Sequence, residues 1–267
     1  MSNTCDKIIQ YVYTYGGSKV IQSFSITDIG KRRKLNQDYV FSSVCPVGKL
    51  PNVFVVADGM GGHNAGDYAS KCTVEKMEQK IRESFEENPV RVLRSAIEYA
   101  NDYIRRQAKE NASLAGMGTT VVAATVCGNV LDVANVGDSR LYIANDKEIR
   151  QITRDHSLVE EMVRMGGIDK QAAKVHPDKN IITRAVGAFD TVEADFFQTV
   201  LQEGDIVLLC SDGLTNMLED EEIRQIICSG ESLRKRAEML IDAANNNGGK
   251  DNISVILVDP FADEVKE

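Results

Sequence analysis

The feature that most constrains the fold is the order in which strand-like and helical segments follow one another. Short apolar runs that end at turn residues predict strands, whereas longer stretches with apolar residues every three or four positions predict amphipathic helices. The order is a group of strands, two helices, a meander of strands, one more strand, two more helices and a final strand. Such a chain buries all of its apolar faces if two sheets pack together and a helix pair covers each outer face.

The strands are expected at residues 21–26, 39–44, 53–57, 119–126, 130–136, 140–144, 148–153, 206–210 and 253–258. The longer helices are expected from about 65 to 86–88, from 89 past 104, at 221–228 and at 233–244, with a short helix at 158–165. Because only short turns separate the strands of the meander, these strands are expected to be antiparallel neighbours. The predicted fold class is therefore α+β, a four-layer α-β-β-α sandwich with two mostly antiparallel sheets.

The chain is interpreted as one domain with two short tails. Residues 1–19 are assigned to an N-terminal tail, 20–260 to the domain and 261–267 to a C-terminal tail. With 43% hydrophobic and 27% charged residues, the 267-residue chain has the composition of a globular protein that needs no disulfide or metal merely to fold. Residues 155–190 have the least regular pattern, and we expect loops there.

The charge and the cysteines disfavour several kinds of partner. Lys and Arg number 31 against 40 Asp and Glu, and the resulting charge of −9 argues against nucleic acid and anionic membranes. No apolar run approaches the roughly 20 residues of a membrane-spanning helix, and nothing resembles a signal peptide. Six scattered cysteines without a CxxC pair are typical of reduced thiols. We therefore expect a cytoplasmic monomer that binds neither nucleic acid nor membranes.

Five aspartates lie at the ends of apolar strands: Asp38, Asp58, Asp138, Asp212 and Asp251. Burying an unpaired carboxylate in such a place is costly, because the ion loses its hydration. If several of them meet at one sheet edge, their repulsion adds to this cost, and a divalent cation would remove both penalties. Each aspartate taken singly is more typical of a turn, especially before glycine. Spacing alone does not place the five together.

Six short motifs stand out, and five of them contain one of these aspartates. They lie at residues 33–38 (RKLNQD), 56–63 (VADGMGGH), 118–120 (GTT), 136–140 (VGDSR), 211–214 (SDGL) and 250–253 (KDNI). In this order and spacing they resemble the bacterial branch of the metal-dependent serine/threonine phosphatases, the PPM or protein phosphatase 2C-like family. The resemblance covers about residues 21–259. It implies an α-β-β-α sandwich, in agreement with the layers inferred above.

The resemblance also implies a set of metal ligands. Asp58 resembles the carboxylate that bridges two metal ions, and the carbonyl of Gly59 resembles an additional ligand. Asp212 and Asp251 resemble the other ligands of the first ion. Asp138 resembles the ligand of a weaker third ion in bacterial members of the family.

Other residues match family positions near the substrate. Asp38 matches the acidic residue that contacts metal-bound water, and Arg33, five residues earlier, matches the phosphate-binding arginine. Together with Asp58, these two are the expected catalytic residues. His63 is a candidate general acid or a residue that organises its loop, and His156 is expected to be structural. Residues 155–190 correspond to the family's flap beside the active site.

The implied cofactor is Mg²⁺ or Mn²⁺, as two catalytic ions with room for a weaker third. Oxygen ligands suit these hard cations, and the shortage of His and Cys clusters argues against zinc. The implied reaction is hydrolysis of phosphoserine and phosphothreonine in proteins by direct attack of a metal-bridging water or hydroxide. The implied partners are phosphorylated proteins and the bacterial Ser/Thr kinase whose action is reversed.

Two alternatives stay open at the level of sequence. The first is a binding module that kept the sandwich and lost the chemistry, although the presence of every ligand aspartate and of Arg33 counts against it. The second is an enzyme for another phosphoester, either a regulator of the anti-sigma-antagonist type or a small molecule. The sequence of residues 155–190 does not decide between substrates.

Overall fold

The strands form two antiparallel sheets, as the order of segments predicts. The computed structural model describes residues 19–61 and 65–263. One sheet has the order β1-β11-β10-β7-β8, with strands at Lys19–Asp28, Ile253–Asp263, Ile206–Cys210, Arg140–Ala144 and Ile149–Gln151. The other has the order β2-β3-β5-β6-β9, with strands at Asp38–Ser43, Val53–Met60, Val121–Cys127, Val130–Val136 and Asp195–Val200. The short strand β4 (Gly118–Thr119) pairs with β3.

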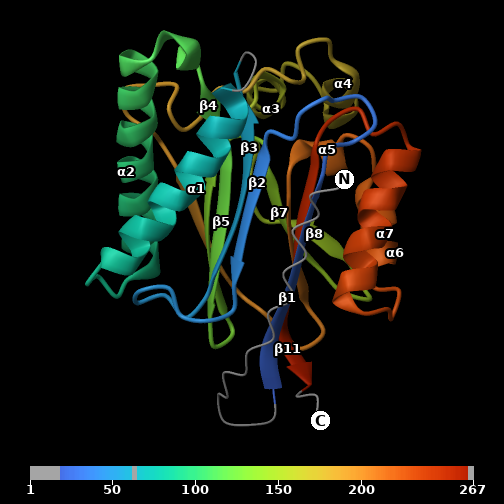
Figure 1. The fold of residues 1–267 in the computed structure, drawn as a ribbon. Coiled ribbons are helices and arrows are strands. Elements are labelled where there is room, and N and C mark those ends of the chain that lie inside the picture. The colour runs from blue at the N-terminus through green and yellow to red at the C-terminus, as the bar shows by residue number, and fades with distance from the viewer. Residues whose placement is uncertain (1–18, 62–64, 264–267) are drawn as a thin grey trace.

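Helices cover the outer face of each sheet (Figure 1). On the sheet that contains β3 lie α1 and α2, which span Ala65–Glu83 and Pro89–Glu110, and a short 3-10 helix, Ala112–Leu114, follows α2. On the sheet that contains β10 lie α5, α6 and α7, which span Asp212–Thr215, Asp220–Ile227 and Leu233–Asn246. The connection from β8 to β9 carries α3 and α4, which span Leu158–Arg164 and Lys170–Val175. The predicted four-layer α-β-β-α sandwich is confirmed.

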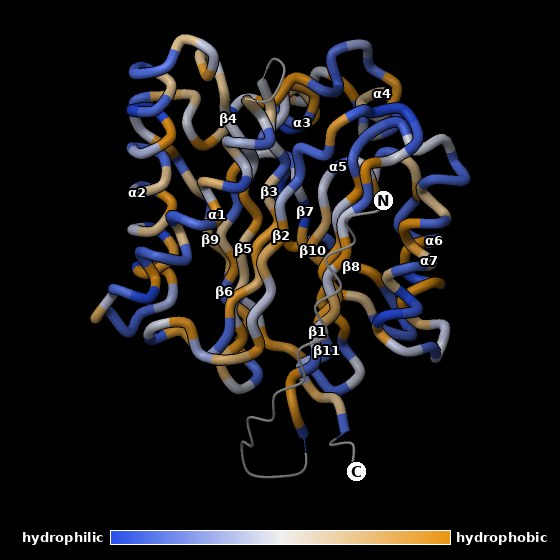
Figure 2. The backbone as a smooth tube through the Cα atoms, in the orientation of Figure 1, coloured by the Kyte–Doolittle hydropathy of each residue, from blue (hydrophilic) through white to orange (hydrophobic). Residues whose placement is uncertain are grey.

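Successive side chains of the central strands serve two different cores, because they point to opposite faces of the sheet. In β3, Val53 and Val55 pack under α1 and α2, whereas Phe54 and Val56 pack against the opposite sheet. A strand that is buried on both faces appears in the sequence as a continuous apolar run. In Figure 2 the central strands are accordingly apolar, and hydrophilic residues gather on the helices and the connections.

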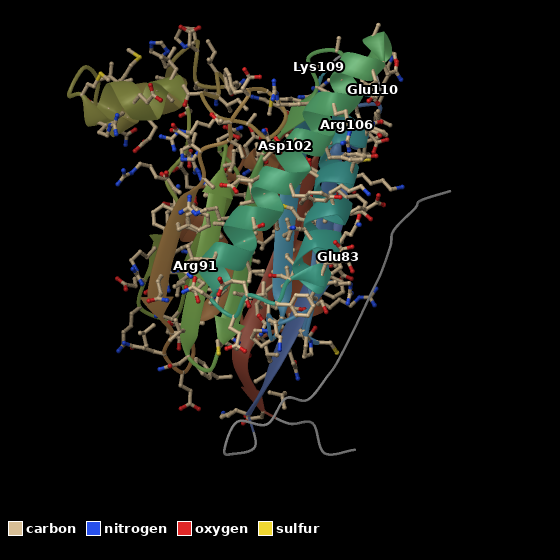
Figure 3. The ribbon with its side chains drawn as sticks, turned by 90° about the vertical axis from the view of Figure 1, so that its left-hand side faces the viewer. Glu83, Arg91, Asp102, Arg106, Lys109 and Glu110 are labelled. Atoms are coloured by element: carbon tan, nitrogen blue, oxygen red, sulfur yellow. The ribbon has the colours of Figure 1, made fainter. Side chains whose placement is uncertain are left out.

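Helix α2 shows how the outer layers form. It begins where the side chain of Asn88 accepts a hydrogen bond from the backbone of Arg91 at 3.1 Å, and Pro89 occupies the first turn. Figure 3 shows that Arg91, Asp102 and Arg106 stand out from this helix, and all three are exposed. The apolar residues of α2 recur at helical spacing and lie on its other face, against the sheet. Burial of this one face holds the helix in place.

The sequence analysis missed β9 and α4. Strand β9 lies at the edge of its sheet beside β6, and its residues are only half-buried or exposed, so it lacks a clear apolar run. Helix α4 is short, and Asp169 begins it by accepting a hydrogen bond from the Ala172 N–H at 2.7 Å. The strand predicted at 119–126 is interrupted at Thr120, whose hydroxyl is hydrogen-bonded to the Asp58 N–H and to Ser139. The last strand reaches Asp263, further than predicted.

Two predicted features fall on residues that the structure does not describe: the tail up to residue 18, and residues 264–267 at the other end. Among the helices of the described chain, none combines the length and apolar character that a bilayer crossing requires.

We expect Val207→Ala to lower the free energy of unfolding by about 1.5–3 kcal/mol, because two buried methyl groups are lost and a cavity is left between the sheets. Val207 is 1% exposed and packs in the core between the two sheets. Val200→Ala is the matched control, since Val200 is 58% exposed on the edge strand β9. Urea unfolding of both variants measures the difference. Equal losses in the two variants would contradict the assignment of this core.

Candidate active site

Strand pairing brings Asp38 and Asp58 together. Strands β2 and β3 are antiparallel, and these two residues are direct partners in their register. Side chains that lie directly opposite in an antiparallel pair share one face of the sheet, with their Cβ atoms about 4.5–5.5 Å apart. Two carboxylates are thus held side by side at the same end of one sheet.

Strand pairing in the other sheet collects three more aspartates. Strand β10 ends at Cys210, which pairs with the first residue of β7 and with the third residue of β11. Asp212 follows this end of β10, Asp138 lies just before β7, and Asp251 lies just before β11. Antiparallel pairing therefore converts three distant positions in the sequence into neighbours at one sheet edge.

The two edges meet at one cavity. The hydroxyl of Ser211, between β10 and α5, donates a hydrogen bond to Oδ2 of Asp38 at 2.7 Å and so joins the sheets. The cavity has a volume of about 600 Å³, and its lining includes Arg33, Asp58, Gly59, Asp138, Asp212 and Asp251. Asp38 is 5% exposed and adjoins the cavity through its strand partner Asp58. The fold thus gathers the described candidate residues in one place.

The carboxyl groups at this cavity repel one another in a poorly hydrated setting. Burial, with added repulsion from Asp212, raises the pKa of Asp38 to about 7 and that of Asp138 to about 8. Burial and then the charge of Asp38 raise the pKa of Asp58 well above its usual range. Burial and then the charge of Asp251 raise the pKa of Asp212. The site therefore favours protons or other cations over bare carboxylates.

The oxygen atoms of the site fit a hard cation. Oδ1 of Asp38 and Oδ1 of Asp212 are buried and have no hydrogen-bond partner among the described residues. Within that same part of the chain, no group of three or more His, Cys, Asp or Glu side chains forms a ligand cluster as it stands. Mg²⁺ usually keeps several waters and takes only one or two protein carboxylates. Buried, unpaired carboxylate oxygens in a cavity with room for water are suited to such an ion.

Threonine side chains fix the backbone of Asp58. The Asp58 N–H donates to Oγ1 of Thr120 at 2.9 Å, and Oγ1 of Thr119 donates to the Asp58 carbonyl at 2.8 Å. Oγ1 of Thr120 also shares a hydrogen bond of 2.7 Å with Oγ of Ser139, the residue after Asp138. The threonine pair thus connects the turns that carry two of the aspartates. This use of Thr120 explains the break between β4 and β5.

Asn252 fixes the loop that carries Arg33. Its Nδ2 donates to the carbonyls of Ile29 at 2.9 Å and Leu35 at 3.0 Å, and its Oδ1 accepts from the Gln37 N–H at 2.9 Å. Asn252 is only 3% exposed, so water cannot readily replace these bonds. The loop before β2 is therefore held against the start of β11.

Arg33 lies on one of the aspartates. Its Nη2 donates to Oδ2 of Asp251 at 2.6 Å, while Oδ1 of Asp251 accepts from the Asn252 N–H at 2.8 Å. Gly213 allows the close approach of this segment, because a Cβ at that position would lie 1.8 Å from the Asn252 carbonyl oxygen. The guanidinium thus reaches the cavity and partly neutralises one acid there.

The flap also contributes to the cavity. Lys179, Asn180 and Ile182 are among the residues that line it, and Lys179 Nζ lies 3.5 Å from the amide oxygen of Asn216. His63 lies outside the described residues, so its role stays a prediction. His156, which we expected to be structural, is buried.

Sequence reasoning did not assign roles to Thr120, Ser211 and Asn252, which position the acids and Arg33 in this structure. Each lies inside one of the six motifs. Their signal is a polar residue directly beside an apolar strand run, where burial requires a hydrogen-bond partner. The sequence cannot show which partner that is.

Known proteins are similar to this chain over most of its length. The family model described as Protein phosphatase 2C matches residues 30–257. Serine/threonine phosphatase stp of Listeria welshimeri is 43% identical over 237 residues, which cover 87% of this chain and 93% of that protein. The crystal structure of serine/threonine phosphatase Stp1 from Staphylococcus aureus has a TM-score of 0.83 and 35% identity, covering 94% of this chain and 98% of that chain. The catalytic domain of the phosphatase PstP, in complex with two manganese ions, has a TM-score of 0.80 and 31% identity, covering 91% and 99%.

Raising the pH should destabilise the metal-free protein. The folded-state pKa values of Asp38 and Asp138, about 7 and about 8, exceed the ordinary value of 3.8. The folded state therefore binds these protons more tightly than the unfolded state, and the stability present below pH ~4 is lost as the pH rises through ~8. Urea unfolding in a chelator, at pH values across this window, measures the loss.

Asp138→Asn should flatten this pH dependence, because it removes one of the two carboxyl groups. Asp220→Asn is the control, since Asp220 is exposed and should leave the slope unchanged. A wild-type stability that stays constant or rises across the window would show that the acids do not repel one another as the structure indicates.

Proposed function

The chain belongs to the protein phosphatase 2C family, and on this premise we propose that it hydrolyses phosphoserine and phosphothreonine in proteins with the help of divalent cations. The observation that carries the proposal is the meeting of partly buried acids and one arginine at a single cavity of about 600 Å³. The relatives named serine/threonine phosphatase, which this chain matches over most of its length, support the choice of substrate.

The proposed cofactor is a pair of Mg²⁺ or Mn²⁺ ions, held by the side chains of Asp58, Asp212 and Asp251 and by the carbonyl of Gly59. The unpaired Oδ1 of Asp212 and the two manganese ions of the similar phosphatase PstP support this assignment. We assign Asp138 to a weaker third ion. When bound, such ions lower the pKa of water and offset the negative charge of a phosphoryl group.

The chain's own residues then act on the substrate and on water. The guanidinium of Arg33 presents a planar set of donors that can bind two phosphoryl oxygens at once. The buried Oδ1 of Asp38 accepts a hydrogen bond from water and so orients it. Thr119 and Thr120 keep Asp58 in place through its backbone.

We propose direct attack by water and no covalent phosphoenzyme. Among the described residues that line the cavity there is no Ser, Cys or His side chain. The hydroxyl of Thr120 is engaged with the Asp58 N–H and with Ser139, so it is not free to attack phosphorus. We further propose that the phosphoproteins on which the enzyme acts are products of a bacterial Ser/Thr kinase.

Asp58→Asn should lower turnover by at least about 100-fold, because even the outer partners of metal ligands are commonly worth about 10- to 100-fold. Phosphate release from a phosphothreonine peptide in Mn²⁺ measures this, with circular dichroism to verify the fold. Asp102→Asn is the control and should retain full turnover, since Asp102 is exposed on α2 and does not line the cavity.

The same assay tests the proposal as a whole. Wild-type turnover that survives thorough chelation would refute the need for cations. A wild-type protein that is inactive with every divalent ion would instead favour a binding module that has lost the chemistry.

Arg33→Ala should lower kcat/KM by about 10- to 100-fold, mostly through KM, because hydrogen bonds to charged groups are worth about 1.5–3 kcal/mol. Arg32→Ala is the matched control: it removes a neighbouring exposed arginine that does not line the cavity. Steady-state kinetics on the same peptide compares the two. Equal effects of both substitutions would indicate general charge attraction in place of a specific phosphate contact.

A further inference from the structure

We propose that His156 is a positioning residue that holds the turn of Asp138 and the base of the flap in one arrangement. This inference rests on the proposed function, because it gives Asp138 a role at the cation site. His156 does not line the cavity, and we assign it the support of Asp138. Several contacts, some to its imidazole and some to its backbone, converge on this buried residue.

The ring and the backbone of His156 both contact the turn before β7. The ring is 5% exposed, and its Nδ1 accepts a hydrogen bond from the backbone N–H of Gly137 at 3.1 Å. The backbone N–H of His156 donates to the Gly137 carbonyl at 2.9 Å. Gly137 immediately precedes Asp138. His156 therefore hydrogen-bonds to both the N–H and the carbonyl of Gly137, the residue directly before Asp138.

The other ring nitrogen faces an acid. Nε2 lies 3.1 Å from Oδ2 of Asp195, the first residue of β9, and Oδ1 of Asp195 accepts from Arg184 at 2.9 Å. Because Nδ1 is an acceptor, the hydrogen of a neutral imidazole must be on Nε2, which donates to Asp195. Burial lowers the pKa of His156, and this favours the neutral form. The ring has one tautomer in which both contacts are satisfied.

The base of the flap closes on the same residue. The carbonyl of His156 accepts from the N–H of Thr183 at 2.8 Å, and the next residue, Ser157, pairs with Ile182. The flap residues that line the cavity, Lys179 and Asn180, lie just before this closure. The start of the flap, its end and the Asp138 turn are therefore joined at one residue, through its backbone and its ring.

The turn has little freedom to adjust if this support is lost. Gly137 has φ of +103°, a conformation that favours glycine, and a Cβ there would lie 2.6 Å from Cγ2 of Thr120. Thr120 thus packs on one side of the turn, and His156 bonds to it from the other. A change in the hydrogen bond at Nδ1 is expected to move Asp138, because the opposite side is blocked.

Two substitutions separate positioning from simple filling of space. In His156→Asn the amide oxygen can take the place of Nδ1 and accept from Gly137, but contact with Asp195 is lost. In His156→Gln the amide nitrogen can take the place of Nε2 and donate to Asp195, but no acceptor faces Gly137. A residue that only fills the interior should tolerate the larger Gln at least as well as Asn.

The experiment is a calorimetric titration of the full-length metal-free protein with Mn²⁺, together with the Mn²⁺ dependence of kcat. His156→Gln should weaken the lower-affinity binding by about tenfold, as expected for an outer partner of a ligand, and His156→Asn should stay within about twofold of wild type. In the Asp138→Ala background, His156→Gln should cause no further loss. This order of effects supports the proposal.

The proposal is overturned if His156→Gln binds Mn²⁺ as wild type does, or if the Asn and Gln variants lose affinity equally. If Asp138→Ala itself leaves Mn²⁺ binding and kcat unchanged, the role of Asp138 fails and this inference fails with it. The loss of turnover in Asp58→Asn still tests the phosphatase assignment separately.

A second pair of variants applies if His156→Gln does not fold. Asp195→Ala removes the acceptor that fixes the tautomer, at a position that is 34% exposed, so it should weaken the lower-affinity binding in the same direction. Glu193→Ala is its control, since Glu193 is 79% exposed and its carboxylate lies 3.8 Å from Arg184. Equal binding by these two variants would overturn the proposal.

Discussion

Several carboxyl groups of like charge are partly or fully buried at one edge of a sandwich whose interior is otherwise apolar. Burial and mutual repulsion raise the pKa of Asp38, Asp58, Asp138 and Asp212. Each such group costs folding free energy when no cation is present, so the remaining fold must supply the difference. Apolar packing does so, chiefly in one core between the sheets and one beneath each helix layer. At the cavity the acids lower the stability of the fold, and the same acids provide the oxygen atoms that a cation can bind.

Neutral side chains position the acids. Thr120, Ser211 and Asn252 are each at most 3% exposed, and they bind backbone groups or a carboxylate oxygen without adding charge. A lysine at any of these positions would neutralise an acid and compete with a cation. Arg33 is the exception, because its guanidinium rests on Asp251. The negative charge that remains for a cation is thus set by which carboxylates lack a cationic partner within the chain.

The layers could be predicted from the sequence because burial on both faces leaves continuous apolar runs. Strands β6 and β7 have the predicted bounds, since turn residues delimit both. Strand β9 could not be predicted, because its side chains are partly exposed and it is defined by pairing with β6. The same limit applies to the site. The motifs named Asp38 and Asp58 as candidates, but only the register of β2 and β3 makes them neighbours.

His156 connects the base of the flap to the turn that carries Asp138. Backbone bonds close the flap at its base, where His156 meets Thr183 and the turn of Asp138. Residues between 158 and 181 lie outside this closure, in the connection that carries α3 and α4. Loops vary more readily than the elements that support them. The base of the flap and the turn of Asp138 are thus held together by hydrogen bonds at the edge of the sheets.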